Sequence, residues 1–181
     1  MKHILFSLIL TAALGCAPAL AAANRPPVPS PELRKLNISV GRWVFHGKTM
    51  RAPGGKNGSW TWHEDCRWSA NGIFLECSFA NDWSGRMVQS LVVDTYNTTD
   101  HSFWHYEMFA AGASGKHPFV SRMTIHANMW VEYGHETEHG KQVGERIVYR
   151  FTSPTRVNVA IQVSRDGVHW VTVDQGVGIK Q

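Results

Sequence analysis

The chain has 181 residues, with 18 Lys and Arg against 14 Asp and Glu, 8 Trp, 3 Cys and a formal net charge of +4. This charge is too small, and the basic residues are too dispersed, to indicate a nucleic-acid-binding protein. Beyond the N-terminal segment, no apolar stretch approaches the ~20 residues that a membrane-spanning helix needs, so we expect no membrane span.

The first 23 residues are typical of an export signal. Lys2 precedes an apolar run over residues 4–14, and Ala21-Ala22-Ala23 offers small residues for cleavage. Removal of 23 of the 181 residues leaves 158, enough for one domain with a substantial core. We therefore expect a bacterial periplasmic or secreted protein. In an alternative interpretation, Ala13-Leu14-Gly15-Cys16 is a loose lipoprotein box and Cys16 carries a lipid anchor.

Residues 24–30 form a linker, because each proline in this Pro-rich stretch fixes its own φ and restrains the residue before it. The chain's best helix start follows. Ser30 can cap and Pro31 suits the first helical position, so we expect a short helix over residues 31–37 with Leu33 and Leu36 on one side. Residues 31–181 make up the predicted domain.

After Gly41 the sequence predicts strands throughout. Apolar and polar residues alternate within segments that are separated by Gly, Asn, Asp and Pro. Short turns between consecutive strands favour an antiparallel meander, and ten long strands remove their free edges by closing. The predicted fold is therefore an all-β barrel of about ten strands; a two-sheet sandwich is the alternative. The expected strands are 42–51, 58–69, 73–83, 86–96, 101–110, 118–127, 129–136, 142–152, 156–165 and 168–178.

Asn71-Gly72 is a strong hairpin signal, because both residues tolerate positive φ. A two-residue loop there places Cys66 opposite Cys77 and Arg67 opposite Glu76. We therefore predict a Cys66–Cys77 disulfide, which suits an oxidising compartment; two reduced buried thiols are the alternative. The two cysteines lack the Cys-x-x-Cys spacing of a zinc site.

Asp166-Gly167 predicts a second two-residue hairpin, with Val163 opposite Trp170 and Val159 opposite Asp174. The apolar face of residues 157–163 should point inward. Asp174 would then lie among apolar neighbours, where a carboxylate needs a partner or protonates. We favour the alternative that Asp174 lies near the barrel rim, in contact with water.

Four short stretches resemble lipocalin-like (calycin) barrels, and more closely a family of secreted bacterial lipocalin-like domains. They are Gly41-Arg42-Trp43 after the short helix, Val93-Asp94-Thr95-Tyr96, Ser164-Arg165-Asp166-Gly167 and Gly178-Ile179-Lys180. In lipocalins a basic side chain of the last strand packs over the motif tryptophan, which implies that Lys180 packs over Trp43. The resemblance implies a cup for a small apolar or amphipathic molecule and no established activity.

Two groups of side chains are candidates for lining such a cup. Trp60, Trp62 and Trp68 share one strand face with Glu64 and Cys66, and this aromatic row could line a pocket or simply fill the core. His101 and His105 share a strand face with Phe103 and Glu107. If that face points inward, the histidines are pocket candidates, together with Asp174. No cofactor is required, although a single inward His could ligate haem iron, as in some other small β-barrels.

The segment Gly134-His135-Glu136-Thr137-Glu138-His139-Gly140 has metal-ligand residue types. Glycines at both ends favour a solvated hairpin tip instead, so we predict no metal site. The Gly-rich residues 110–115 could form a lid over the barrel mouth or an ordinary loop.

No catalytic motif is present in the sequence: there is no Gly-x-Ser-x-Gly elbow, phosphate-binding Gly loop or His-Glu-x-x-His. Glu64, His105, Glu107 and Asp174 have the chemistry for acid–base work, but nothing in their spacing requires it. The favoured function is an exported binding protein for a small apolar or amphipathic molecule. An enzyme acting on such a molecule and an envelope-associated interaction module with a filled barrel are the alternatives.

Overall fold

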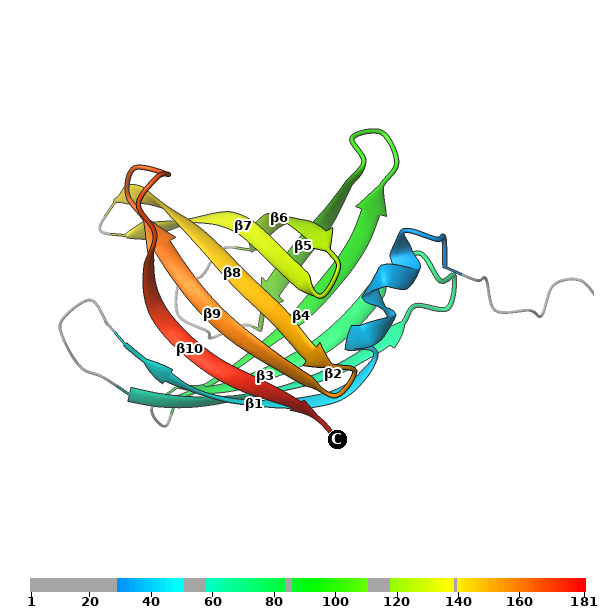
Figure 1. The fold of residues 1–181 in the computed structure, drawn as a ribbon, viewed down its shortest axis with the longest axis horizontal. Helices are drawn as coiled ribbons and strands as arrows, with labels where there is room; N and C mark the ends of the chain where they lie inside the picture. The colour runs from blue at the N-terminus through cyan, green and yellow to red at the C-terminus, as the bar shows by residue number, and fades with distance from the viewer. Residues whose placement is uncertain (1–28, 51–57, 84–85, 111–117, 139) are drawn as a thin grey trace, which may run out of the picture.

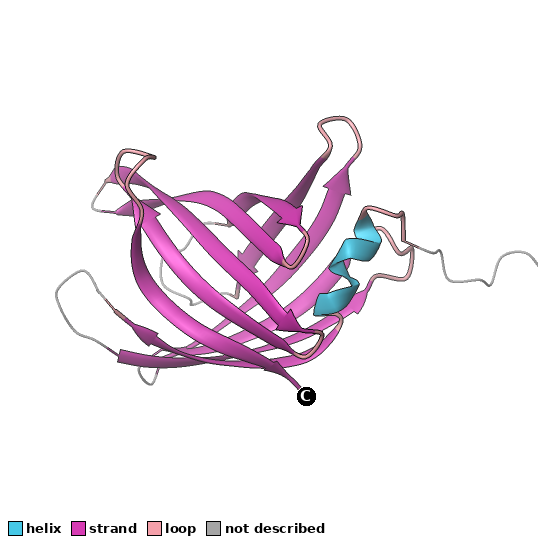
Figure 2. Ribbon diagram, in the orientation of Figure 1, coloured by secondary structure: helices cyan, strands magenta, loops and turns pink. Residues whose placement is uncertain are grey.

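The structure, a computed structural model, describes residues 29–50, 58–83, 86–110, 118–138 and 140–181. These residues form one antiparallel β-barrel with a short helix at one end (Figures 1 and 2). The expected export signal, the lipoprotein box and most of the linker lie outside the described residues, as does most of the Gly-rich segment 110–115. No described helix has the length and apolar character needed to cross a bilayer.

The described elements follow the predicted strand pattern to within a few residues. In chain order they are η1 (Leu33–Ser39), β1 (Gly41–Thr49), β2 (Gly58–Trp68), β3 (Leu75–Trp83), β4 (Arg86–Asn97), β5 (Ser102–Phe109), β6 (Phe119–His126), β7 (Met129–Glu138), β8 (Lys141–Ser153), β9 (Arg156–Ser164) and β10 (Val171–Lys180).

The sheet closes on itself. Each strand pairs antiparallel with its neighbours in sequence, and β1 pairs with both β2 and β10. Trp43 lies opposite Lys180 across one of these ladders and opposite Glu64 across the other. Closure pairs the strand edges that an open sheet would leave exposed. The barrel prediction is therefore confirmed and the sandwich alternative is excluded.

The helix is a 3₁₀ helix over Leu33–Ser39 rather than a helix over residues 31–37. Its hydrogen bonds span three residues, as from the Val40 N–H to the Asn37 carbonyl. Ser30 does act at its start, since its Oγ accepts a hydrogen bond from the Leu33 N–H at 3.2 Å. Leu33 and Leu36 are buried where η1 packs across one end of the barrel (Figure 1).

The β2–β3 hairpin has the predicted register. Cys66 lies opposite Cys77, Arg67 opposite Glu76 and Trp60 opposite Trp83. Cys66 and Cys77 form a disulfide, so the prediction of this bond is confirmed within the structure.

The register predicted for the β9–β10 hairpin is wrong. Asp166 Oδ1 accepts hydrogen bonds from the Val168 and His169 N–H groups, which produces a wider loop than the two-residue turn expected. β10 therefore begins at Val171, opposite Val163, and a bulge follows between Thr172 and Asp174. Asp174 consequently lies opposite Ile161 rather than Val159.

Asp174 is buried rather than wet. Only 5% of its surface is exposed, and its Oδ1 accepts a hydrogen bond from Trp60 Nε1 at 3.1 Å. Asp174 does lie near one end of the barrel, opposite Thr49 at the end of β1, but the expected contact with water is wrong. The neutral partner that a buried carboxylate needs is an indole N–H.

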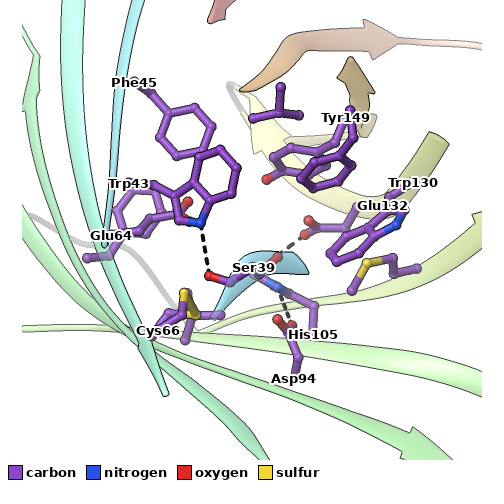
Figure 3. Close-up of a pocket in the computed structure, with 16 residues that line it drawn as sticks. Ser39, Trp43, Phe45, Glu64, Cys66, Asp94, His105, Trp130, Glu132 and Tyr149 are labelled. Carbon is purple, nitrogen blue, oxygen red and sulfur yellow. Dashed lines mark hydrogen bonds and ion pairs between the residues drawn. A yellow bond between two sulfur atoms is a disulfide. The ribbon is translucent and has the colours of Figure 1, made fainter. Parts of the chain in front are cut away.

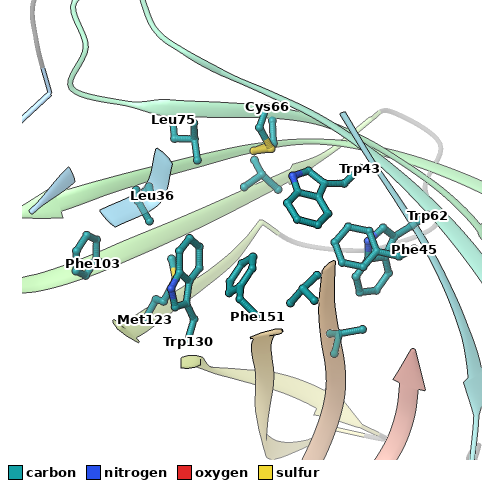
Figure 4. Close-up of a cluster of buried hydrophobic side chains, with 14 of the residues drawn as sticks. Leu36, Trp43, Phe45, Trp62, Cys66, Leu75, Phe103, Met123, Trp130 and Phe151 are labelled. Atoms are coloured by element: carbon teal, nitrogen blue, oxygen red, sulfur yellow. A yellow bond between two sulfur atoms is a disulfide. The ribbon is translucent and has the colours of Figure 1, made fainter. Parts of the chain in front are cut away.

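The core is rich in aromatic rings that face the barrel interior (Figure 4). Trp60 and Trp62 stack with ring centroids 4.6 Å apart, and Phe45 lies 4.8 Å from Trp62. Lys180 Nζ lies 5.4 Å above the Trp43 ring and donates to the Ile38 carbonyl. These contacts join the first strand, the last strand and η1 at one end of the barrel.

Candidate functional site

A cavity of about 60 Å³ lies inside the barrel (Figure 3). Six aromatic rings line it, together with the disulfide and a group of ionisable side chains. These side chains come from different strands: Glu64 from β2, Asp94 from β4, His105 from β5 and Glu132 from β7. The remaining lining residues are Ser39, Trp43, Phe45, Cys66, Cys77, Phe79, Val92, Met123, Trp130, Tyr149, Phe151 and Val157.

His105 is held between two carboxylates. Its Nδ1 lies 2.8 Å from Asp94 Oδ1, and its Nε2 lies 3.6 Å from Glu132 Oε1. Asp94 and His105 are cross-strand partners in the β4–β5 ladder, which explains their short contact. Burial alone lowers the pKa of His105, but the charges of Glu132 and Asp94 outweigh it and raise this pKa to about 10. His105 is therefore an imidazolium at neutral pH, with both ring N–H groups directed at carboxylates.

Glu132 is almost completely buried, with 2% of its surface exposed. Its Oε1 accepts a hydrogen bond from Ser121 Oγ at 2.6 Å, and Ser121 lies on the adjacent strand β6. Burial raises the pKa of Glu132, while the charge of His105 and the Ser121 hydrogen bond act in the opposite direction. A second hydrogen bond of the same kind is donated by Ser90 Oγ to Glu107 Oε1 at 2.6 Å.

Glu64 differs from these carboxyl groups, because no described residue makes a hydrogen bond or ion pair with its carboxyl. Burial raises the pKa of Glu64, and the negative charge of Asp94 raises it further. The charge of His105 acts in the opposite direction, but the pKa still reaches about 8. Glu64 is thus mostly a neutral acid at pH 7 that ionises when a positive charge approaches. Burial likewise raises the pKa of Tyr149 well above its usual value.

Of the histidines and tryptophans predicted to line a pocket, only His105 is among the described residues that line the cavity. His105 lines the cavity, whereas His101 lies in the exposed turn between β4 and β5, with φ of 52° and Tyr96 Oη 3.3 Å from its Nδ1. Trp60 and Trp62 face inward with Glu64 and Cys66, but they pack in the core beyond the cavity lining. Trp68 is partly buried and donates from Nε1 to Asn37 Oδ1 at 2.9 Å, beside η1.

The chain does turn between β7 and β8 within residues 134–140, as predicted, but residues 134–138 of this segment belong to a strand. β7 continues to Glu138 and β8 begins at Lys141, opposite it, so His135 is an exposed strand residue. His139 lies outside the described residues. Within the part of the chain that the structure describes, no group of three or more His, Cys, Asp or Glu side chains is arranged to hold a metal ion.

Sequence reasoning did not select Asp94, Ser121, Glu132 or Tyr149 as site residues. The reason is clearest on β7, where Met129, Val131 and Tyr133 form the more apolar face and yet Trp130 and Glu132 point inward. A buried polar cluster reverses the usual alternation, so the period-2 pattern of β7 alone does not identify Glu132 as an inward residue. The two-residue turn at Ala127-Asn128 is the local signal that could have identified it, because this turn pairs Glu132 with Met123. Met123 is buried, and directly paired residues share one face of the sheet.

The site does not fit haem. Its volume of about 60 Å³ is far below the roughly 300–1,000 Å³ typical of pockets for larger ligands. Both nitrogens of His105 are directed at carboxylates, so neither is free to ligate iron or to accept a proton from a bound molecule.

Ten described antiparallel strands in sequence order, closed into a barrel with a short 3₁₀ helix at one end and a polar cluster inside, define a lipocalin-like, calycin-type β-barrel. Solved structures of other proteins share this fold. Rv2717c from M. tuberculosis matches with a TM-score of 0.59 at 12% identity, over 84% of this chain and 99% of its own. The S-type phycobiliprotein lyase CPES from Guillardia theta matches with a TM-score of 0.53 at 10% identity, over 82% of this chain and 91% of its own.

At these identities the similarity establishes the fold. No protein-family model matches the chain, and no curated protein sequence matches it.

Proposed function

We propose that this chain is an exported binding protein that holds a small amphipathic molecule inside its barrel. The observation that carries the proposal is the interior cavity itself, where apolar rings surround a few convergent polar groups from β2, β4, β5 and β7. This combination of apolar wall and sparse polar anchors is typical of ligand sites.

The buried charges add support. Taking ions out of water costs several kcal/mol each, and a buried ion pair often contributes less to stability than apolar packing would. Three carboxyl groups in one cavity lining, with one imidazolium between two of them, are therefore a poor solution for stability alone. They are better explained as groups that recognise a ligand.

Export rests on residues 1–23 and is a proposal about the mature protein. Mass spectrometry of the mature N-terminus tests it: we expect Asn24 as the first residue, whereas a lipid-bearing Cys16 would establish the anchored alternative.

Ligand-dependent thermal unfolding tests the binding function. A ligand that binds only the folded chain stabilises it by about 2.7 kcal/mol at 100 times its dissociation constant. We expect at least one small amphipathic compound in a panel to raise the unfolding temperature in a concentration-dependent manner. Trp43 and Trp130 line the cavity, so the same compound should change the tryptophan fluorescence. A panel of small polar, apolar and charged molecules without any effect would contradict the proposal.

The alternative of an interaction module with a filled barrel is favoured by a different observation. The outer face of β4, β5 and β6 carries exposed apolar side chains that are cross-strand neighbours: Leu91 beside Met108, and Tyr106 beside Val120. Contiguous exposed apolar patches mark interaction surfaces. Substitution of Leu91 and Met108 by Gln should abolish association in sedimentation experiments if this alternative holds, and should leave the sedimentation of a ligand-binding monomer unchanged.

A further inference from the structure

The walls of the cavity are aromatic and negatively charged at once. Six rings line it, from Trp43, Phe45, Phe79, Trp130, Tyr149 and Phe151. Three carboxyl groups line it as well, and His105 is the one basic side chain among the described residues of its lining. Aromatic faces and carboxylates share one preference, because both attract positive charge.

The three carboxyl groups are not equivalent. Asp94 is bound to His105, and Glu132 is bound to Ser121 and lies near His105. The Glu64 carboxyl lines the same cavity without a hydrogen bond or ion pair from the described residues. Glu64 is only partly buried, so its carboxyl is accessible to a partner from outside the chain.

The volume restricts what that partner is. An engineered cavity of 150 Å³ accommodates benzene, which has six heavy atoms. A cavity of about 60 Å³ therefore suits a molecule of about two to four heavy atoms. The rings favour an organic ion over a metal ion, and the described carboxyl and imidazole groups are not arranged for metal coordination.

We propose that the ligand of this barrel is a small alkylammonium ion, whose charge lies against the Glu64 carboxylate and whose alkyl groups lie against the aromatic rings. The proposal rests on the binding function proposed above and names the chemical class of its ligand. Figure 3 shows the Glu64 side chain close to the Trp43 ring, which offers the carboxylate and an aromatic face from adjacent strands.

Binding should also release a proton. The ionisable groups that influence the pKa of Glu64 are Asp94, His105, Glu107 and Glu132. The charge of Glu64 in turn raises the pKa of Tyr149. With His105 the one cation in this set, Glu64 holds a proton near neutral pH in the free protein. An ammonium ion replaces that proton, so binding is accompanied by release of up to one proton at pH 7 and becomes tighter as the pH rises from 6 to 8.

The experiment titrates the purified full chain with a size-matched charge series: ethylammonium, ethanol and acetate, at constant ionic strength. Calorimetry in buffers of different ionisation enthalpy reports both affinity and proton release, and tryptophan fluorescence reports occupancy. We expect saturable binding of ethylammonium, with proton release, and no binding of ethanol or acetate over the same concentrations.

The matched variants are Glu64→Gln, which keeps the size of the side chain, and Asp65→Asn, its exposed neighbour on the opposite strand face. Glu64→Gln should weaken ethylammonium binding at least tenfold and abolish proton release, whereas Asp65→Asn should bind like the wild type. The wild-type charge series does not depend on either variant folding.

Each other outcome overturns the inference in a recognisable manner. Binding of ethanol, acetate or larger neutral compounds without ethylammonium refutes the ligand class and leaves the binding function standing. Competition of calcium or zinc ions for the ethylammonium site, with equal or higher affinity, refutes the organic cation. No binding by any member of this series or of the broader amphipathic panel refutes the binding function itself.

Discussion

At the scale of single residues, the barrel interior is organised around His105. Its imidazolium is the one basic group among the described residues that line the cavity, and it lies between Asp94 and Glu132. Removing one partner of a buried ionic network is costly, because it leaves the remaining charges uncompensated.

We expect His105→Gln to destabilise the protein by about 3–5 kcal/mol at neutral pH. Glu132→Gln in the same chain should restore part of this loss, since it removes one unpaired charge. Chemical denaturation of both variants measures the effect, with His63→Gln, an exposed residue of β2, as the control. A loss of unfolding free energy in His105→Gln no larger than in His63→Gln would show that the ionic contacts of His105 do not stabilise the fold.

Glu64 gives the pH dependence of stability a definite sign. Its pKa is raised from 4.5 in the unfolded chain to about 8 in the folded barrel, so the folded state binds the proton more tightly. The corresponding stability is fully present below pH 4.5 and is lost as the pH rises towards 8. Each unit of pKa difference corresponds to about 1.4 kcal/mol, which gives an effect of a few kcal/mol.

We therefore expect the free energy of unfolding of the ligand-free wild type to fall between pH 5 and 8, and to fall distinctly less in Glu64→Gln. The fall above pH 6.5 that arises from the raised pKa of His105 should remain in both proteins. Urea titrations across this range provide the test, and parallel pH profiles for wild type and variant would be the contrary result.

The sequence predicted only part of this cluster. The inward face of Glu64 follows from tryptophans at alternate positions of β2, which fix the strand orientation. Asp94 gives no such signal, because Leu91, Val92 and Val93 are apolar on both faces of β4. The contact between groups on β2, β4, β5 and β7 depends on barrel closure and strand stagger, which no local pattern contains.

At the scale of elements, the two hairpins show what turn residues determine. Asn71-Gly72 gave the register of β2 and β3 because opposite charges, cysteines and tryptophans all agreed with it. Asp166-Gly167 has the same kind of dipeptide, yet the Asp166 carboxylate binds backbone N–H groups beyond the turn and a bulge follows in β10. Both features depend on side-chain contacts that hairpin statistics do not include.

The disulfide in the first hairpin should contribute modestly to stability. It joins residues only 11 apart, and the loop-closure estimate for such a short loop is about 2–3 kcal/mol. We expect the Cys66→Ala, Cys77→Ala double variant to lose about this much in the free energy of unfolding while retaining its far-UV circular dichroism. Loss of the folded barrel on reduction would mean that the bond is required for folding.

Glycines on β1 and β10 make room for the Trp60 ring. A Cβ at Gly176 would lie 2.6 Å from both the His46 carbonyl oxygen and the Trp60 ring. Because backbone cannot move aside cheaply, Gly176→Ala should cost about 1–3 kcal/mol. Gly144→Ala, whose Cβ would make only ordinary contacts at 3.4 Å, is the matched control, and thermal unfolding distinguishes the two. Equal stability of both variants would contradict this packing.

At the scale of the whole molecule, the fold was the most predictable feature. Ten alternating segments with short connections are sufficient for a closed meander, because closure is how such a sheet removes its edges. The content of the barrel was less predictable. The sequence left open whether the aromatic rings fill the interior or surround a cavity, and the structure shows that Trp60 and Trp62 fill it while Trp43 and Trp130 border a small space.

Both proposals require that this space binds a ligand, the second of them through Glu64. A high-resolution crystal structure of the purified protein, both before and after soaking in ethylammonium, provides the test. We expect electron density that is not water in the cavity, with a positively charged nitrogen within hydrogen-bond distance of the Glu64 carboxylate. A cavity that holds only ordered water under both conditions would contradict this expectation.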